Sequence, residues 1–324
     1  MRVQGTGTNH SRRPVVIIAG PTASGKSRMA IDIATAFDGI IINADSMQVY
    51  RELRVLTARP SPADEAMVPH RLYGVLPASE RCSAGRWAAM AAREIDAAHA
   101  AHRLPIVVGG TGLYLKALTE GLAPVPEIPA EIQAAAIALH AELGGAAFRD
   151  ALAALDPESA ARLPAGDRQR LVRAYAVAAA TGRPLSDWQR TPVRSPVAGA
   201  RFAILVLDPP REVLNDAIAR RLDAMLAAGA VAEVQALLDL GLDPALPVMK
   251  AVGVRELAAC VRGECSLEPA RAAAKVATYR FAKRQRTWIR HQILPHLGMH
   301  EQYSERIRPK IFTFIRQFLL TFAS

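Results

Sequence analysis

A glycine-rich segment near the start of the chain has the composition of a phosphate-binding loop. Residues 20–27 read GPTASGKS and fit the pattern G-x-x-x-x-G-K-[ST]. In such a loop, backbone N–H groups turn toward a phosphate, Lys26 reaches the phosphate chain and the Ser27 hydroxyl can hold Mg²⁺. The pattern predicts a diphosphate cradle and leaves open whether the phosphates belong to a nucleotide. Its expected members are Gly20, Thr22, Ala23, Ser24, Gly25, Lys26 and Ser27.

Two more motifs carry polar groups that could act on the same ligand. Asp45 follows the apolar run at residues 39–43, and the motif GGTG at residues 109–112 follows another run. A carboxylate beside a phosphate cradle could hold Mg²⁺ through water, act as a base or cap a helix. The GGTG motif, with the Thr111 hydroxyl, could be a second phosphate-binding turn or an ordinary strand-to-helix turn.

Positive charge gathers in the last third of the chain. Residues 250–290 carry ten basic and three acidic side chains, hence +7 of the net charge of +10. In the helix predicted at residues 279–290, four cations share an arc of about 120°. They are Arg280, Lys283, Arg284 and Arg290. A stripe this dense favours binding to a nucleic-acid backbone over a solvated face, whereas Phe281 and Trp288 are expected in the core.

Two other helices carry arginines. Asp208 precedes a predicted helix from residue 211 to about 226, and we interpret it as the cap of that helix, which contains Arg220 and Arg221. Further upstream, Asp156 should cap a helix and Gly182 should end one. Between those two positions, an arc of about 100° holds Gln169, Arg170 and Arg173, opposite the apolar stripe. That face could bind phosphates or be solvated.

Short apolar runs predict the scaffold for these side chains. Runs at residues 14–19, 39–43, 105–108 and 202–207 are rich in β-branched residues, which is typical of buried strands. A helical pattern covers residues 26–37. Strands alternating with helices predict an α/β fold, here a P-loop core with a parallel sheet and helices on both faces.

The chain is expected to contain a discontinuous core, an insertion and a tail. A proline-rich linker precedes a helical pattern, so residues 122–197 are predicted to form an all-helical insertion domain. Residues 14–121 and 198–295 would form the catalytic core with its basic C-terminal helices. Residues 296–324 would be a tail with one amphipathic helix, to which no role is assigned.

Composition narrows the class of protein. No apolar run reaches the roughly 18 residues of a membrane-spanning helix, and no signal-peptide core is present, so no membrane partner is expected. The three cysteines are an odd number without metal-ligand spacing, which argues against a disulfide framework and a zinc site. Both observations favour a cytoplasmic protein.

Taken together, the motifs resemble the tRNA dimethylallyltransferase (isopentenyltransferase) family in order and spacing. They are residues 20–27, 45–48, 69–70, 109–114, 169–173, 250–255 and 283–290. The resemblance covers about residues 14–292. It implies transfer of a dimethylallyl group from dimethylallyl diphosphate to N6 of adenosine 37 in the anticodon stem-loop of tRNAs. It also implies that the P-loop holds this diphosphate with Mg²⁺ rather than ATP, and we expect a monomer.

The resemblance also implies residue roles. Asp45 would be the general base, Thr111 and Arg221 would hold the diphosphate in the catalytic centre, and Ser27 would bind Mg²⁺. The residues implied to contact tRNA are Asp45, Ser46, Met47, Gln48, Gln169, Arg170, Leu171, Val172, Arg173, Lys250, Gly253, Arg255, Lys283, Arg284, Gln285, Arg286, Trp288 and Arg290. Three positions depart from the family pattern: Arg54 opens RVLTARP in place of DIGTAKP, Gly74 replaces an Asp and Ala217 replaces an Arg.

Three other functions fit parts of the sequence. A P-loop small-molecule kinase would bind ATP, but it would leave the basic C-terminal helix unexplained. A nonenzymatic RNA-binding protein would leave Asp45 and the GGTG motif unexplained. A relative that alkylates free adenine nucleotides would not need two basic faces. Tests with dimethylallyl diphosphate and either tRNA or AMP discriminate among them.

Overall fold

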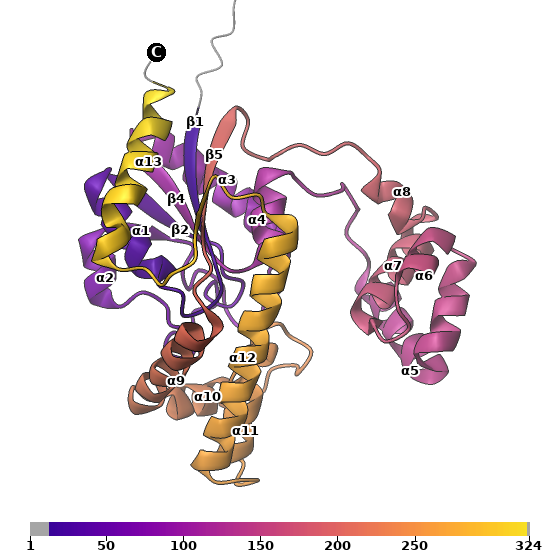
Figure 1. Ribbon diagram of the computed structural model, residues 1–324. Helices are drawn as coiled ribbons and strands as arrows, with labels where there is room; N and C mark the ends of the chain where they lie inside the picture. Colours follow the sequence, from indigo (N-terminus) through magenta and orange to yellow (C-terminus); the bar gives the residue numbers. More distant parts are fainter. Residues whose placement is uncertain (1–12, 323–324) are drawn as a thin grey trace, which may run out of the picture. The chain divides into compact units, whose positions relative to one another are not determined.

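The computed structural model describes residues 13–322, and its core is a parallel β-sheet (Figure 1). The sheet has six strands in the order β3-β2-β4-β1-β5-β6, and every neighbouring pair is parallel. The strands are β1 (Arg13–Ala19), β2 (Gly39–Asn43), β3 (His70–Arg71), β4 (Leu104–Gly109), β5 (Ala200–Leu207) and β6 (Leu297–Met299). The predicted α/β class is confirmed.

Helices cover both faces of this sheet because successive strand side chains point to opposite sides. Val15 and Ile17 of β1 pack into one hydrophobic cluster, and Val16 and Ile18 pack into the other. The first cluster includes buried residues of α3 (Ala84–Ala100) and α4 (Gly112–Thr119). The second includes residues of α1 (Lys26–Ala36) and α13 (Arg308–Leu320), which lie together on the other face in Figure 1.

The remaining elements around the sheet connect its strands or follow β5. Between β2 and β3 lies α2 (Pro62–Met67). After β5 come α9 (Arg211–Ala227), α10 (Ala230–Asp239), η1 (Val248–Lys250), α11 (Val254–Val261), α12 (Leu267–Gln292) and η2 (Glu305–Ile307). The predicted amphipathic helix of the tail is α13, whose Ile311 and Ile315 are fully buried.

Residues 120–195 form a second compact unit made of helices. These are α5 (Ala130–Ala153), α6 (Pro157–Arg162), α7 (Arg168–Thr181) and α8 (Leu185–Gln189). As predicted, Asp156 caps α6, and Gly182 ends α7 in a left-handed conformation with φ 66°. The apolar core of this unit contains Phe148 and Leu152 from α5 and Leu171 from α7.

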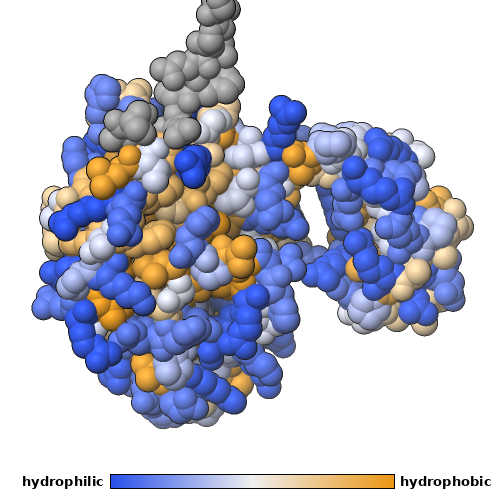
Figure 2. Space-filling view, turned by 45° about the horizontal axis from the view of Figure 1, so that its top comes forward, coloured by the Kyte–Doolittle hydropathy of each residue, from blue (hydrophilic) through white to orange (hydrophobic). Residues whose placement is uncertain are grey.

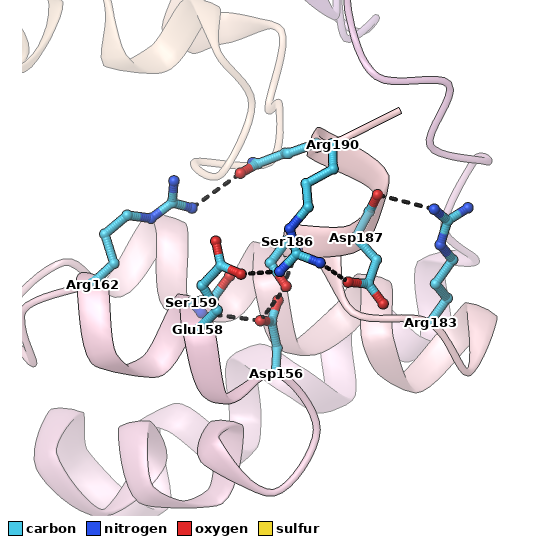
Figure 3. A network of polar contacts seen from close by, with 9 residues as sticks. Asp156, Glu158, Ser159, Arg162, Arg183, Ser186, Asp187 and Arg190 are labelled. Carbon is cyan, nitrogen blue, oxygen red and sulfur yellow. Dashed lines mark hydrogen bonds and ion pairs between the residues drawn. The ribbon is translucent and has the colours of Figure 1, made fainter. Parts of the chain in front are cut away.

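A buried carboxylate joins two of these helices (Figure 3). Asp156 is fully buried and accepts hydrogen bonds from the Ser159 amide at 3.0 Å, the Ser186 amide at 3.1 Å and the Ser186 hydroxyl at 2.8 Å. Around it, Arg190 pairs with Glu158 and with Asp187. Several donors satisfy the buried charge, so Asp156 both caps α6 and fixes the start of α8.

The face of the protein drawn in Figure 2 mixes hydrophilic and hydrophobic residues. None of the helices within residues 13–322 has the length and apolar composition required to cross a membrane.

Candidate active site

A polar pocket of about 450 Å³ lies where β1, β2 and β4 end. Its walls include the P-loop, Asp45, Gln48, Arg221 and Gln285. Loops at the carboxyl edge of a parallel sheet converge, which explains why motifs far apart in the sequence share this space. The structure therefore brings the P-loop and Asp45 together as the sequence predicts.

The P-loop joins β1 to α1 through two residues with left-handed backbones. Ala23 has φ 64° and Gly25 has φ 95°. The Lys26 ammonium donates a hydrogen bond to the Pro21 carbonyl at 2.6 Å, within the same loop. Burial, followed by the neighbouring guanidinium of Arg221, lowers the pKa of Lys26 from 10.5 to about 7, although the Asp45 carboxylate opposes the shift. Near neutral pH, Lys26 is therefore present in both its charged and its neutral form.

This lowered pKa predicts proton uptake when a diphosphate binds. At pH 8 the Lys26 amine is mainly neutral, and an anion beside it raises its pKa and draws in a proton. Calorimetry at pH 8, in buffers with different ionisation enthalpies, should show wild type taking up about one proton more than Lys26→Met. At pH 5.5 the difference should vanish, because Lys26 is already charged. Equal uptake by both proteins at pH 8 would contradict the prediction.

Arg221 reaches the P-loop from α9. Its guanidinium donates a hydrogen bond to the Thr22 hydroxyl, and burial lowers its pKa although Asp45 opposes the shift. Arg220 lines the same pocket beside Ala217, one of the positions that depart from the family pattern. The pocket thus holds a cationic wall together with Asp45, which suits a ligand with several negative charges.

Asp45 is held in a tight turn at the end of β2. The side chain of Asn43 accepts a hydrogen bond from the Asp45 amide at 2.8 Å and donates one to its carbonyl at 3.0 Å. One carboxylate oxygen, Oδ1, accepts from the Met47 amide at 2.8 Å. The turn orients the carboxylate at the pocket wall, and within residues 13–322 the hydrogen bond to this carboxylate is made to Oδ1 and not to Oδ2.

Thr111 braces the turn that carries Asp45. Its hydroxyl accepts a hydrogen bond from the Ser46 amide at 2.9 Å, and its amide donates to the Ala44 carbonyl at 3.3 Å. The pocket lining from this motif comes from Val108 and Gly109. In the described residues Thr111 thus contacts the neighbouring loop, and its role toward a diphosphate stays a prediction.

Gln48 connects the pocket to the loop that departs from the family pattern. Its amide donates to the Thr57 carbonyl at 2.7 Å and to the Ala58 carbonyl at 3.1 Å. Glu233 of α10 accepts from three amides of the same loop, at residues 54–56. Gly74 leaves room for a neighbouring guanidinium, since a Cβ there would lie 2.2 Å from Nη1 of Arg59. Hydrogen bonds to Gln48 and Glu233 therefore hold this loop in place beside the pocket.

Gln285 of α12 bridges the two glycine-rich turns. Its carbonyl accepts from the Thr22 amide at 2.8 Å, and its amide group donates to the Gly110 carbonyl at 3.1 Å. The side chain is 6 % exposed. Trp288 is half-buried over Gly112, where a Cβ would lie 2.1 Å from its ring. The family resemblance predicts tRNA contacts for both residues, and the structure places Gln285 in the interior.

The interpretation of Asp208 as a helix cap is wrong. The N-cap of α9 is Pro210, which offers no side-chain bond. The Asp208 carboxylate instead accepts from Arg286 Nε at 2.5 Å and Arg290 Nη2 at 3.1 Å. These hydrogen bonds lower the pKa of Asp208, although burial opposes them. Because Arg286 and Arg290 lie within hydrogen-bond distance, the Asp208 carboxylate pairs with them instead of accepting from backbone amides at the start of α9.

The other late basic residues surround a second depression of about 560 Å³, here named the basic pocket. Lys250, Arg255, Arg280 and Arg284 line it and are exposed. Lys283 is exposed on the same helix as Arg280 and Arg284. Gly253 lies deeper, because a Cβ there would meet Leu56 at 2.8 Å. The basic pocket and the P-loop pocket share no lining residue.

In the helical unit, α7 separates polar and apolar faces as the sequence predicts. Gln169, Arg170 and Arg173 are exposed. Leu171 and Val172, which lie within the range implied to contact tRNA, have side chains buried in the core of this unit. Only the polar face of α7 is available to a large ligand.

Sequence patterns missed several residues that shape the P-loop pocket. Tyr73 lines it from the stretch between the motif at residues 69–70 and Gly74, and Gln302 lines it from a segment that carries no recognised motif. Arg28 also lines it, next to the last residue of the P-loop pattern. Only the position of Arg28, directly after a phosphate loop, offered a signal.

Comparison with known proteins agrees with this geometry. The IPP transferase family profile matches residues 48–292. A tRNA dimethylallyltransferase from Rhodospirillum centenum is 57 % identical over 281 residues, covering 87 % of this chain and 90 % of that protein. One from Rhodospirillum rubrum is 54 % identical over 315 residues, covering 96 % and 97 %.

A solved structure extends the likeness to the whole fold. The tRNA isopentenylpyrophosphate transferase from Bacillus halodurans superposes with a TM-score of 0.68 at 29 % identity, and the match covers 96 % of this chain and 98 % of that one. The profile match, the close relatives and the shared fold agree with the P-loop pocket. The chain belongs to the IPP transferase family.

Proposed function

We propose that this chain is a tRNA dimethylallyltransferase that transfers a dimethylallyl group from dimethylallyl diphosphate to N6 of adenosine 37 in tRNA. Relatives that carry this name are 51–57 % identical over most of the chain. The observation that carries the chemistry is one pocket in which the P-loop, Arg221 and Asp45 face the same space. A leaving diphosphate and the proton of an attacking amine need these groups.

Asp45 acts as the general base in this proposal. The N6 amine of adenine is a poor nucleophile because its lone pair is delocalised into the ring. As N6 forms a bond to C1 of the dimethylallyl group, the C1–O bond breaks, diphosphate leaves and the amine proton passes to Asp45 Oδ2. Asn43 and Met47 hold the other polar atoms of Asp45, so the accepting oxygen is already oriented.

The cationic wall stabilises the leaving group. Lys26, Arg221 and the P-loop amides surround the space where the diphosphate gathers charge in the transition state. The reaction also requires that water be kept from the allylic centre, whose cation character would otherwise lead to hydrolysis. Thr111 supports this arrangement through the Asp45 turn.

The residues present fit Mg²⁺ held mainly by substrate. The Ser27 hydroxyl and Asp45 line the same pocket, whereas residues 13–322 contain no group of three His, Cys, Asp or Glu that could hold a metal ion alone. Mg²⁺ is commonly bound by one or two protein oxygens together with phosphates and waters. When bound, it neutralises charge on the diphosphate.

The tRNA anticodon stem-loop is the proposed partner of two exposed basic surfaces. One is the polar face of α7, and the other is the basic pocket with Lys283. Adenosine 37 would leave the stacked loop to reach Asp45, as bases in RNA loops readily do. We further propose that the protein acts as a monomer in the cytoplasm. Residues 120–195 would serve tRNA binding, while the sheet-containing unit would perform catalysis and bind tRNA through the basic pocket.

Salt dependence tests these two surfaces. Each side chain that binds a phosphate should contribute about 0.7–0.9 to the slope of log K against log salt. Arg170→Gln combined with Arg284→Gln should therefore flatten the slope for tRNA binding by about 1.4–1.8 units while diphosphate binding stays unchanged. Lys310→Gln, an exposed cation on α13, is the matched control and should keep the wild-type slope. An unchanged slope in the double variant would show that these faces are merely solvated.

The proposed reaction is tested by labelled dimethylallyl diphosphate offered with bulk tRNA or with AMP. Label should enter tRNA and not AMP. Label in AMP alone would identify a nucleotide alkylating enzyme, and ATP binding without dimethylallyl diphosphate binding would identify a kinase.

A further inference from the structure

The segment that follows α12 returns to the P-loop. Residues 297–307, here named the return segment, begin with β6, which pairs with β5 at the edge of the sheet. The Met299 carbonyl accepts from the Asp208 amide at 2.9 Å, so the return segment also fixes the residue that holds Arg286. This segment lies beyond residue 292, where the family match ends.

Two consecutive residues of the return segment contact the P-loop directly. Gln302 Nε2 donates to the Ala23 carbonyl at 3.1 Å, and the Tyr303 amide donates to the Ser24 carbonyl at 3.4 Å. A Cβ at Gly25 would lie 2.8 Å from the Tyr303 Cβ, which leaves no space for a larger residue there. The return segment therefore packs against the backbone that must bind a diphosphate.

These contacts bear on the most strained part of the loop. Ala23 has φ 64°, a left-handed conformation that is strained for a residue with a Cβ. A phosphate loop works only while its carbonyls point away from the ligand and its amides point toward it. The bond from Gln302 holds the Ala23 carbonyl and so opposes relaxation of this peptide.

Two side-chain amides thus form hydrogen bonds with the P-loop backbone at neighbouring residues. Gln285 accepts from the Thr22 amide, and Gln302 donates to the Ala23 carbonyl. Both glutamines also line the pocket, alongside Lys26 and Arg221. Gln302 is therefore placed to act on the ligand site, as well as on the stability of the fold.

A second set of contacts anchors the return segment to α1, the helix that begins at Lys26. The Tyr303 hydroxyl donates to Asp32 Oδ2 at 2.7 Å, and Arg308 lies 2.8 Å from the same oxygen. The side chain of Asp32 is only 10 % exposed. Burial, with the hydrogen bond to Asp32, raises the pKa of Tyr303 to about 12, so its hydroxyl remains a donor at neutral pH. Ile307 and Ile311 then continue into the core.

We propose that the return segment completes the diphosphate site, with Gln302 as a positioning residue that fixes the Ala23 carbonyl and thereby directs the P-loop amides toward the diphosphate. The proposal rests on the proposed function, because it assumes a diphosphate donor. Tyr303 supports Gln302 by tying the segment to Asp32.

Binding of inorganic diphosphate with Mg²⁺ tests the proposal on the full chain. Gln302→Met keeps the length of the side chain and removes its donor, so calorimetry should show about 2- to 13-fold weaker binding, the range expected for one hydrogen bond. Tyr303→Phe should also weaken diphosphate binding. In steady state, KM for dimethylallyl diphosphate should rise in both variants, while KM for tRNA stays unchanged. Glu301→Gln is the matched control, since Glu301 pairs with exposed Arg306 in the same segment.

The outcomes separate this proposal from the proposed function. If wild type binds diphosphate and both variants bind it equally well, the positioning role is overturned, even where their melting temperatures fall. Equal rises in KM for tRNA and for dimethylallyl diphosphate would also overturn it, because they indicate general loss of structure. If wild type itself fails to bind diphosphate, the proposed function fails as well.

Discussion

Asp45→Asn is expected to transfer dimethylallyl groups to tRNA about 10²- to 10⁴-fold more slowly than wild type, the usual contribution of a general base. The asparagine carbonyl oxygen can still accept from the Met47 amide, and the hydrogen bonds between Asn43 and residue 45 involve only the backbone of residue 45. The turn should therefore persist while the oxygen that receives the proton is replaced by an amide group. Substrate binding should survive the change.

Single-turnover transfer at saturating Mg²⁺, with melting temperature recorded alongside, distinguishes this role from two others. If Asp45 only held Mg²⁺ through water, the loss would appear as weaker Mg²⁺ and diphosphate binding, partly restored at high Mg²⁺. If it only formed the turn, the variant would keep both a near-normal rate and a near-normal melting temperature, because asparagine can accept the same hydrogen bond. Asp38→Asn, at an exposed carboxylate paired with Arg103, is the matched control. A rate within about threefold of wild type would rule out Asp45 as the base.

The central strands could be predicted because their physical cause is local. The runs at residues 39–43 and 105–108 have apolar side chains on both faces of the strand, because helices bury both faces of the sheet. The strands β2 and β4 form at these runs. The edge strands β3 and β6 could not be predicted, since with two and three residues they are too short to show a pattern. Their pairing depends on neighbours that only the folded chain provides.

The site was predictable where a short motif carries the chemistry. Residues 20–27 form a turn whose glycine at position 25 needs a left-handed backbone, and that requirement is written in the sequence. Asp208 shows the opposite case. The residue types before α9 favour a cap, but the partners of Asp208 come from α12, far along the chain.

Long-range contacts also explain why two glutamines gave no signal of their structural role. Gln285 lies within a basic stretch of the sequence, and only the family resemblance assigned it a role, as a contact to tRNA. It is buried because α12 runs past both glycine-rich turns, where its amide satisfies a donor and an acceptor at once. Gln302 has no patterned neighbours, and its position depends on β6 pairing with β5.

Lys26→Met should weaken binding of dimethylallyl diphosphate by about 10- to 150-fold, the equivalent of one charge-assisted hydrogen bond worth about 1.5–3 kcal/mol. The substitution keeps the apolar stem of the side chain and removes its ammonium group. A bound anion favours the charged form of Lys26. The loss of affinity caused by Lys26→Met should therefore be larger at pH 6, where Lys26 of wild type is mostly protonated before binding. At pH 8 the affinity of wild type is itself reduced, because Lys26 must be protonated as the ligand binds.

A crossed pair of variants makes this prediction specific to the P-loop. Lys250, an exposed cation of the basic pocket, is matched to Lys26 in chemistry and lies outside the lining of the P-loop pocket. Lys250→Met should weaken tRNA binding and spare dimethylallyl diphosphate, whereas Lys26→Met should do the reverse. Titrating both variants with each ligand separates local charge from a general change in net charge, because each substitution removes one positive charge. If both variants bound both ligands more weakly and to the same extent, the division of the chain's cations into a diphosphate set and a tRNA set would be wrong.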